Sequence, residues 1–370
     1  MAATLSMVGV DRRTAAVDLR ERIAPLWPSV SPQGAIPLTT CLRCETYMLA
    51  DDPERVRADL VGRLATHSRL PAPIVRSAVT LRTGRPSVEH LFSVAAGLES
   101  PIVGERQILD QVRRSWDAAR PAPLDARLDR LFQHAVAAGR RVRRDTAIGQ
   151  TAVSLARTAA GLAAAEGDLG GAAVTVIGAG AVARSAALAL ADRGARTFAV
   201  AGRSAESRAA LGAALRARGA HCVGVPWTAR SAAIAAADLV VCATGAPGLV
   251  LTPGDLSHGR IRIVIDLASP RDVDPGVGSC RGVRLIDLEA VWREAGQHQR
   301  IAPAEVARAH AIVAGCADTY MRWLAERRVA PAIAALRARG PAPAGRDGER
   351  GRLLHQQTLA LKRLALHAGE

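Results

Sequence analysis

The feature that most constrains the fold is a glycine turn placed between an apolar run and an amphipathic segment. The run Val174-Thr175-Val176-Ile177 leads directly into Gly178-Ala179-Gly180-Ala181-Val182-Ala183, which follows a G-x-G-x-x-A pattern. In this pattern the first glycine permits a tight turn, the second lets the backbone approach a pyrophosphate, and the small last residue keeps helix and strand close. The segment therefore predicts the strand, turn and helix of a dinucleotide-binding unit, with all six turn residues at the cofactor.

The end of the next apolar strand indicates which dinucleotide is bound. Residues 198–201 are followed by Gly202, Arg203 and Ser204, at a point where an NAD enzyme usually carries Asp or Glu for the ribose hydroxyls. Arginine and serine suit a 2′-phosphate instead, so we expect NADPH. The alternative is that Arg203 is a solvated arginine at a strand end.

Two more apolar strands follow, at residues 238–243 and 263–267. Strands that alternate with helical segments favour a doubly wound parallel sheet, here from about residue 170 to 287. Such a sheet predicts a cofactor but does not by itself define a reaction.

The chain length of 370 residues favours two or three domains. Residues 1–150 predict an α+β catalytic domain, with short strands at 5–10, 36–41 and 45–50 and helices near 53–67, 86–97, 103–119 and 124–145. Residues 151–287 form the predicted Rossmann domain. Residues 288–370 show helical periodicity to about 339, a break at 340–345 and a basic helix at 351–367, which is typical of a long connecting helix and a helical dimerisation region.

Composition excludes several classes of protein. Apolar residues make up 49% of the chain, which excludes a disordered chain. No stretch of about 18 residues is apolar and free of charge, so we expect no membrane span. The first dozen residues lack a basic head followed by a long apolar stretch, so we expect no secretory signal and a cytoplasmic protein.

The net charge of +15 favours an anionic partner such as nucleic acid, because phosphate contacts release counterions. The alternative reading is compositional, since an arginine- and alanine-rich chain with almost no lysine is typical of a GC-rich genome. Aromatic residues are only 3% of the chain, which argues against a platform for stacking single-stranded bases.

Two of the six cysteines, Cys41 and Cys44, lie close together in the sequence, on either side of Arg43. A cation beside a cysteine lowers the pKa of the thiol, and a thiolate that attacks an acyl carbon forms a thioester that NADPH can reduce to an aldehyde. Two alternatives remain open: Cys41 is a buried strand cysteine, or the C-x-x-C pair is a redox or metal pair. Because no second pair and no nearby histidine accompany it, we predict no metal site.

Several separate motifs in one order resemble the glutamyl-tRNA reductase family, the NADPH enzymes that open the five-carbon route to tetrapyrroles. The resemblance covers residues 4 to about 338. The motifs that carry it are Gly9-Val10-Asp11-Arg12-Arg13-Thr14-Ala15, Leu19-Arg20-Glu21, Thr39-Thr40-Cys41-Leu42-Arg43-Cys44-Glu45, the runs 90–100 and 103–109, and Asp266-Leu267-Ala268-Ser269-Pro270-Arg271-Asp272-Val273.

The resemblance implies a reaction and a site. In it Cys41 is the nucleophile that takes the aminoacyl group from glutamyl-tRNA, His90 is important for activity, and NADPH reduces the thioester to glutamate-1-semialdehyde, the first step of tetrapyrrole (porphyrin) biosynthesis. It also implies a homodimer and, as a further partner, the aminomutase that consumes the aldehyde. The substrate-binding pattern corresponds to Thr40, Leu42, Arg43, Ser100, Glu105, Arg106, Gln107 and Gln111. Arg43 is suited to a bidentate grip on a substrate carboxylate.

The chain departs from the family pattern at several positions, which include Ala16 in place of a proline and the additional thiol Cys44. Leu42 replaces the usual asparagine after the nucleophile, Arg12 replaces a histidine, and Arg106 replaces a proline; the helical dimerisation region is also shortened. Two alternatives to a glutamyl-tRNA reductase follow: a divergent paralogue that reduces another aminoacyl-tRNA or acyl ester, and a non-catalytic tRNA- or protein-binding relic. For single residues, His90 could be a packed structural histidine, Ser100 a helix cap, and Glu105, Gln107 and Gln111 caps or solvated side chains.

Overall fold

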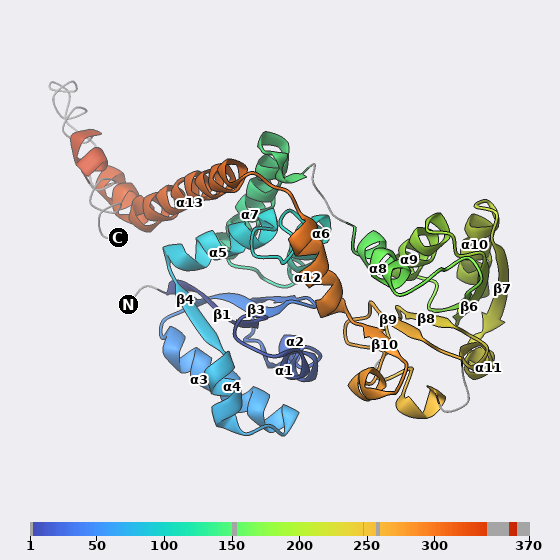
Figure 1. Ribbon diagram of the computed structural model, residues 1–370. Coiled ribbons are helices and arrows are strands. Elements are labelled where there is room, and N and C mark those ends of the chain that lie inside the picture. The colour runs from blue at the N-terminus through green and yellow to red at the C-terminus, as the bar shows by residue number, and fades with distance from the viewer. Residues whose placement is uncertain (1–2, 150–153, 247, 257–259, 339–354, 361–370) are drawn as a thin grey trace, which may run out of the picture. The chain divides into compact units, whose positions relative to one another are not determined.

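The computed structural model describes residues 3–149, 154–246, 248–256, 260–338 and 355–360 (Figure 1). The chain divides into two compact units. The first unit comprises residues 1–100, 104–150 and 301–370, and the second comprises residues 101–103 and 151–300. The described residues from 301 onward thus belong with the first unit. The three-domain division stays a prediction.

The first unit contains a four-stranded antiparallel sheet. Its strands are β1 (Thr4–Asp11), β2 (Ile36–Thr39), β3 (Arg43–Ala50) and β4 (Thr80–Thr83), in the order β2-β3-β1-β4. The apolar pattern predicts a second strand that reaches Cys41, but β2 ends at Thr39. Thr39 pairs with Cys44 across the hairpin, so residues 40–42 form the turn between β2 and β3.

Helices cover both faces of this sheet. Residues of α1 (Val17–Ile23), α2 (Trp27–Val30), α3 (Pro53–Ser68) and α4 (Ala72–Ala78) share one apolar core with Val8, Val10, Cys44 and Met48 of the sheet. The opposite face contacts α5 (Arg85–Ala96) and α7 (Ala126–Asp145), where Tyr47 of β3 meets Phe132 edge to face. Helix α6 (Arg106–Ala119) contacts β2, α5 and α7. The β1 and β4 strands and helices α1–α4 are visible in Figure 1.

The helical periodicity near the end of the chain corresponds to two helices. Helix α12 (Leu288–His298) belongs to the second unit, and α13 (Pro303–Ala338), 36 residues long, belongs to the first. Proline is tolerated at the first position of α13 because no helical partner is lost there. Tyr320 fixes α13 to the first unit: its hydroxyl donates to the Arg127 carbonyl at 2.9 Å, and its ring meets Phe92. The predicted linker at 340–345 lies outside the described residues, and of the predicted helix at 351–367 only residues 355–360 are described, as helix.

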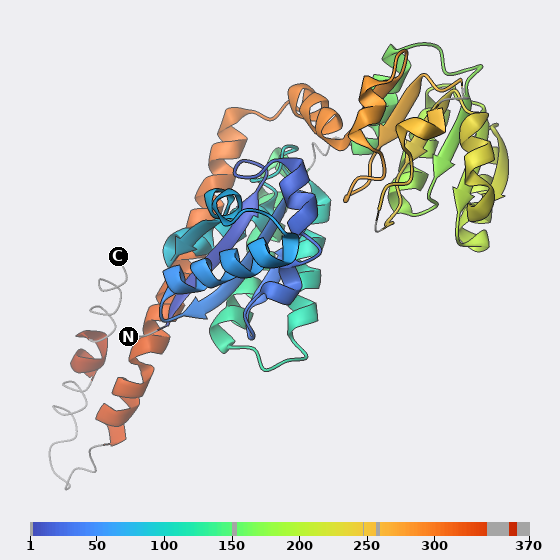
Figure 2. The same cartoon turned by 90° about the horizontal axis from the view of Figure 1, so that it is seen from below.

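The second unit is a six-stranded parallel sheet, which confirms the doubly wound prediction (Figure 2). Its strands are β5 (Ala173–Ile177), β6 (Thr197–Gly202), β7 (His221–Pro226), β8 (Leu239–Cys242), β9 (Ile263–Asp266) and β10 (Arg284–Ile286), in the order β10-β9-β8-β5-β6-β7. Its helices are α8 (Leu155–Ala165), α9 (Ala181–Asp192), α10 (Ala205–Arg216), α11 (Arg230–Ala235) and α12.

Side chains of one strand enter different cores on the two faces of this sheet. Leu239 and Val241 belong to one apolar cluster, whereas Val240 and Cys242 belong to the other. Strands buried on both faces are continuously apolar, which is why the sequence pattern identified β5, β8 and β9. Among the described residues, no helix is both long and apolar enough to cross a membrane.

Candidate functional site

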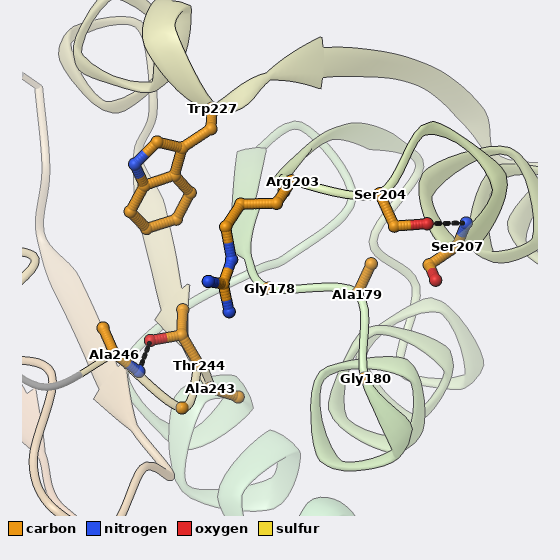
Figure 3. Close-up of a pocket in the computed structure, with 12 residues that line it drawn as sticks. Gly178, Ala179, Gly180, Arg203, Ser204, Ser207, Trp227, Ala243, Thr244 and Ala246 are labelled. Carbon is orange, nitrogen blue, oxygen red and sulfur yellow. Dashed lines mark hydrogen bonds between the residues drawn. The ribbon is translucent and has the colours of Figure 1, made fainter.

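A pocket of about 460 Å³ opens at the carboxyl ends of four neighbouring strands of the second unit (Figure 3). Ligands of doubly wound sheets bind at this edge, where loops from adjacent strands meet. The lining residues follow β5 (Gly178, Ala179, Gly180), end or follow β6 (Gly202, Arg203, Ser204, Ser207), follow β7 (Trp227) and follow β8 (Ala243, Thr244, Gly245, Ala246).

The glycine turn shapes the floor of the pocket. Gly178 has a φ of +110°, and a Cβ placed on it would collide with the Ala243 carbonyl oxygen, so only glycine fits there. A Cβ on Gly180 would meet no atom within 4 Å, and no side chain caps the first turn of α9 behind it. The backbone therefore leaves an open approach for a phosphate at the positive end of a helix.

The six residues of the turn have different environments. Gly178, Ala179 and Gly180 line the pocket, whereas Ala181, Val182 and Ala183 form the first turn of α9. Ala183 is fully buried in the core against the sheet, and Val182 is 42% exposed. Ala183, the last small residue of the pattern, therefore packs the helix against the sheet and does not line the pocket.

Arg203 and Ser204 lie on the wall that β6 provides. The side chain of Arg203 extends into the pocket (Figure 3), and Ser204 caps α10 by accepting the Ser207 N–H at 3.1 Å. Arg208, which the sequence analysis did not single out, donates to the carbonyls of Gly202 and Arg203 and so fixes this turn. None of the lining residues is acidic, which suits an anionic ligand.

The loop after β8 is held by two buried aspartates of the 266–273 motif. Asp272 accepts both the N–H and the hydroxyl of Thr244 at 2.7 Å. Asp266 accepts the backbone N–H groups of Ala268, Asp272 and Val273. Burial raises the pKa of Asp266 to about 7, against the opposing effect of these hydrogen bonds. The motif therefore holds Thr244, and with it the part of the pocket wall that follows β8, in place.

Cys41 lies in the first unit, in the tight turn between β2 and β3. The hydroxyl of Thr40 accepts the N–H groups of Leu42 (3.1 Å) and Arg43 (3.2 Å), and the Thr40 N–H donates to the Arg43 carbonyl at 2.8 Å. Leu42 is buried, with 3% of its surface exposed, and Cys41 is partly exposed. Thr40 therefore builds the turn that presents Cys41.

The Cys41 thiol does not have the low pKa that its neighbour Arg43 suggested. Burial raises this pKa to about 12 and Glu105 adds to the rise; Arg43 lowers it as expected, but by less than burial raises it. Arg43 is itself committed elsewhere. Its side chain is 2% exposed, and its guanidinium pairs with Glu45 at 3.0 Å and donates to the Glu99 carbonyl at 2.9 Å. In this structure Arg43 binds protein groups, and its role toward a substrate carboxylate stays a prediction.

Glu45 is the centre of a buried polar cluster that the sequence analysis missed. Its Oε1 lies 2.8 Å from His90 Nε2 and 3.0 Å from Arg43 Nη1, and its Oε2 accepts the Tyr47 hydroxyl at 2.7 Å. Burial alone would raise the pKa of Glu45, but His90, Arg43 and these hydrogen bonds lower it to about 2. The signal was present in the sequence, because Arg43, Glu45 and Tyr47 alternate along one strand and so share a face.

Buried polar atoms without a partner lie in the segments beside Cys41. Within the described part of the chain, Thr39 Oγ1, Arg43 Nε and Ser100 Oγ have no hydrogen-bond partner. The Arg43–Glu99 hydrogen bond brings the Ser100 segment next to the hairpin. Such atoms are rare in folded proteins, and each calls for an explanation.

The remaining predicted residues lie on or before α6, which contacts β2. Glu105 directly precedes the helix without capping it, and burial raises the pKa of its carboxyl. Gln107 is exposed and Gln111, one turn later, is half-buried. Arg106 begins the helix, and its side chain lies outside the described part of the structure.

Cys44 has the environment of a core residue. It is 1% exposed, packs among the apolar side chains on the α1–α4 face, and has a pKa raised to about 12 by burial and by Glu45. Both Cys41 and Cys44 are free thiols. Within the described ranges there is no group of three His, Cys, Asp or Glu residues that could hold a metal ion.

Comparisons with known proteins identify the family. The family model "Glutamyl-tRNAGlu reductase, N-terminal domain" matches residues 8–146, and the model "Shikimate / quinate 5-dehydrogenase" matches residues 161–293. Glutamyl-tRNA reductase from two strains of Thermus thermophilus is 35% identical over 99% of this chain and 95% of the relative. The chain belongs to the glutamyl-tRNA reductase family. Its members are oxidoreductases, so the expectation of an enzyme with this fold is confirmed.

Other members of the glutamyl-tRNA reductase family resemble the chain over most of its length. The protein of that name from Sorangium cellulosum is 34% identical over 90% of this chain and 69% of its own length. The solved glutamyl-tRNA reductase from Methanopyrus kandleri is 28% identical, covers 99% of this chain and 97% of its own, and has a TM-score of 0.45. The second unit of this chain, which matches the dehydrogenase family model, suits a nicotinamide cofactor.

Proposed function

We propose that this family member reduces glutamyl-tRNA to glutamate-1-semialdehyde through a thioester on Cys41, with NADPH as reductant. The observation that carries the proposal is the surroundings of Cys41, where Thr39, Arg43 and Ser100 hold buried polar atoms without partners in the described structure. A substrate with polar groups would satisfy these atoms, whereas an inert core cysteine would leave them unexplained.

The first step is acyl transfer to sulfur. Cys41 attacks the ester carbonyl carbon; the C–S bond forms, the bond to the tRNA ribose oxygen breaks, and the thiol proton goes to that oxygen. A thiol with a pKa of about 12 needs a proton acceptor near neutral pH. Glu105 is the carboxyl group whose charge acts most strongly on Cys41, so we assign the transfer of this proton to Glu105.

His90 acts within the cluster around Glu45. The 2.8 Å contact between His90 Nε2 and Glu45 Oε1 fixes the orientation of the ring, as a carboxylate partner does for functional histidines in general. We therefore assign His90 to activity, as the family resemblance implies, and Glu45 to positioning it. Thr40, Leu42, Arg43, Ser100 and Glu105 surround the acyl group in this proposal, with Arg106, Gln107 and Gln111 at the start of α6.

The pocket of the second unit fits the proposed NADPH. Open space above Gly180 admits a pyrophosphate, and Arg203 with the N-terminus of α10 at Ser204 suits a 2′-phosphate. When bound, NADPH would supply the hydride that breaks the C–S bond and releases the aldehyde; Cys41 leaves as a thiolate and takes up a proton to return to the thiol. None of the residues that line the pocket is acidic, so no carboxylate of the lining would repel the phosphates.

The proposed partners follow from the same activity. The net charge of +15 favours binding of the tRNA backbone. The 36-residue helix α13 favours a homodimer, and the aminomutase that consumes the aldehyde is the proposed further partner. The cytoplasmic location stays a prediction.

The test is NADPH oxidation by the full chain with glutamyl-tRNA and a panel of other charged tRNAs, with the aldehyde trapped and identified. Cys41→Ser should abolish turnover, and the matched control Cys44→Ser, which changes a core thiol three residues later, should retain it. Loss of activity in both variants together with lowered stability would count against a specific role for Cys41.

Leu42 supports a second candidate function, in which the protein reduces a different aminoacyl-tRNA. Its side chain is buried and apolar where the family pattern has a hydrogen-bonding asparagine. Turnover with a charged tRNA other than glutamyl-tRNA would establish this paralogue function. Binding of tRNA and NADPH without turnover across the whole panel would favour the non-catalytic alternative.

A further inference from the structure

We propose that Trp227 is the surface on which the adenine ring of the dinucleotide stacks, and that Arg230 holds its indole in place. The proposal rests on the cofactor site assigned above and adds the adenine contact. No sequence pattern pointed to Trp227, which follows β7 without any neighbouring motif.

Strand register places Trp227 beside Arg203. Gly202 of β6 pairs with Pro226 of β7, so the next residues of the two strands, Arg203 and Trp227, emerge side by side at the pocket. Figure 3 shows both side chains on the same side of the pocket, with the glycine turn beyond the Arg203 guanidinium.

The order of the strands fixes the order of the ligand groups. The glycine turn after β5 suits the pyrophosphate, and Arg203 after β6 suits the 2′-phosphate on the adenosine ribose. The adenine ring, which is attached to that same ribose, then lies toward the next strand, β7. Trp227 is the residue that β7 contributes to the pocket.

The chemistry of the wall supports this assignment. Trp227 is the only aromatic residue among the described residues that line the pocket, and the others are glycine, alanine, serine, threonine and one arginine. A purine needs a flat apolar surface, and an indole ring provides one.

Arg230 restricts the indole ring. Its guanidinium carbon lies 4.6 Å from the centroid of the ring, and its Nη1 donates to the Trp227 carbonyl at 3.2 Å. A cation held against an aromatic ring fixes the orientation of the ring. Arg230 is therefore a positioning residue, which acts on the adenine only through Trp227.

The experiment measures binding to the full chain, without turnover. The probes are 2′,5′-ADP, which carries adenine and the 2′-phosphate, and the 1,N⁶-etheno derivative of NADP⁺, whose fluorescence is quenched by stacking on an indole. Reduced nicotinamide mononucleotide, which lacks adenine, is the third probe. The variants are Trp227→Ala and Trp227→Phe, with Trp323→Phe on α13 of the first unit as matched control.

Trp227→Ala should weaken the binding of 2′,5′-ADP about ten- to a hundredfold. It should also abolish the quenching of the etheno probe and leave the binding of the mononucleotide unchanged. Trp227→Phe should restore most of the affinity, and Trp323→Phe should match the wild type. Equal affinity of wild type and Trp227→Ala for 2′,5′-ADP would overturn the stacking role and leave the cofactor site standing. Equal weakening of the mononucleotide would mean that Trp227 only supports the fold. No binding of any probe to the wild type would overturn the cofactor site itself.

Discussion

His90 Nε2 and Glu45 Oε1 lie 2.8 Å apart, and both side chains are at most 3% exposed. The contact joins α5 to β3 across the interior of the first unit. Arg43 shares the same carboxylate oxygen, so Arg43, directly after the Cys41 turn, and His90, 47 positions later in the chain, depend on one acidic side chain. A change at Glu45 should therefore affect both.

Replacing Glu45 by glutamine should cost stability and activity together. Removing one partner of a buried charged cluster costs about 3–5 kcal/mol, because the remaining charge stays buried without compensation. We expect turnover to fall on the order of 10²–10⁴-fold, because His90 loses its orientation. Urea unfolding and NADPH oxidation measure the two effects, with Glu54→Gln, an exposed glutamate paired with Arg57, as control. Wild-type turnover in Glu45→Gln would refute the positioning role.

The stability contributed by Glu45 should depend on pH. Its pKa in the folded protein is about 2, below the usual value of 4.5, so the contribution is complete above about pH 4.5 and is lost as the pH falls toward 2. The difference in unfolding free energy between wild type and Glu45→Gln should therefore shrink between pH 5 and pH 3. A difference that stays constant over this range would contradict the lowered pKa.

Asp266 should show the opposite dependence. Its folded-state pKa is raised to about 7, so its ionisation opposes folding, and stability should decline as the pH rises from about 4 to 7. Asp266→Asn keeps an acceptor for the backbone N–H groups and should flatten this decline. Thermal unfolding of both proteins at pH 4.5, 6 and 7.5 measures it, and parallel curves would exclude Asp266 as the source.

The Cys41 thiol should react slowly with iodoacetamide at neutral pH. With a pKa of about 12, only about one thiol in 10⁵ is ionised at pH 7, so the rate should increase about tenfold per pH unit up to pH 10. Mass spectrometry of the peptide that contains Cys41 separates it from Cys280 and Cys316, which are also partly exposed. Labelling of Cys41 at pH 7 as fast as that of free glutathione would contradict the raised pKa.

Arg203 should set the preference for NADPH over NADH. Arg203→Ala removes the guanidinium at the pocket, and charge-assisted hydrogen bonds of this kind are worth about 1.5–3 kcal/mol, so NADPH should bind about ten- to a hundredfold more weakly. Affinity for NADH should not change. Titrations with both cofactors test this, with Arg218→Ala, an arginine paired with Asp192 away from the pocket, as control. An equal loss of affinity for NADH would show that Arg203 does not bind the 2′-phosphate.

The sequence predicted the second unit well because its strands are buried on both faces and follow one another with short helical connections. The glycine turn could also be predicted, because the positive φ of Gly178 is a backbone conformation that hardly any other residue adopts. The hairpin turn at Cys41 was placed two residues late, because Thr40 stops β2 through its side chain, which an apolar pattern does not register.

The electrostatics of the site could not be read from neighbours in the sequence. Arg43 lies two residues from Cys41, but its guanidinium points to Glu45, and the thiol is governed by burial and by Glu105, 64 residues away in the sequence. Trp227 was missed for a similar reason, since only the pairing of β6 with β7 brings it beside Arg203. Contacts between segments that are distant in the sequence determine both the pKa of Cys41 and the position of Trp227. Such contacts become visible only once the fold is known.

The alternation of side chains along β3 limits how this hairpin can evolve. Arg43, Glu45 and Tyr47 face the polar cluster, whereas Cys44, Thr46 and Met48 face the α1–α4 core, where Thr46 accepts the Trp27 indole N–H. A shift of β3 by one residue against its neighbouring strands would exchange these two sets and bury two charges in an apolar core. A residue inserted into or deleted from the 40–42 turn should therefore be tolerated only where the loop absorbs it and the pairing of Thr39 with Cys44 is kept.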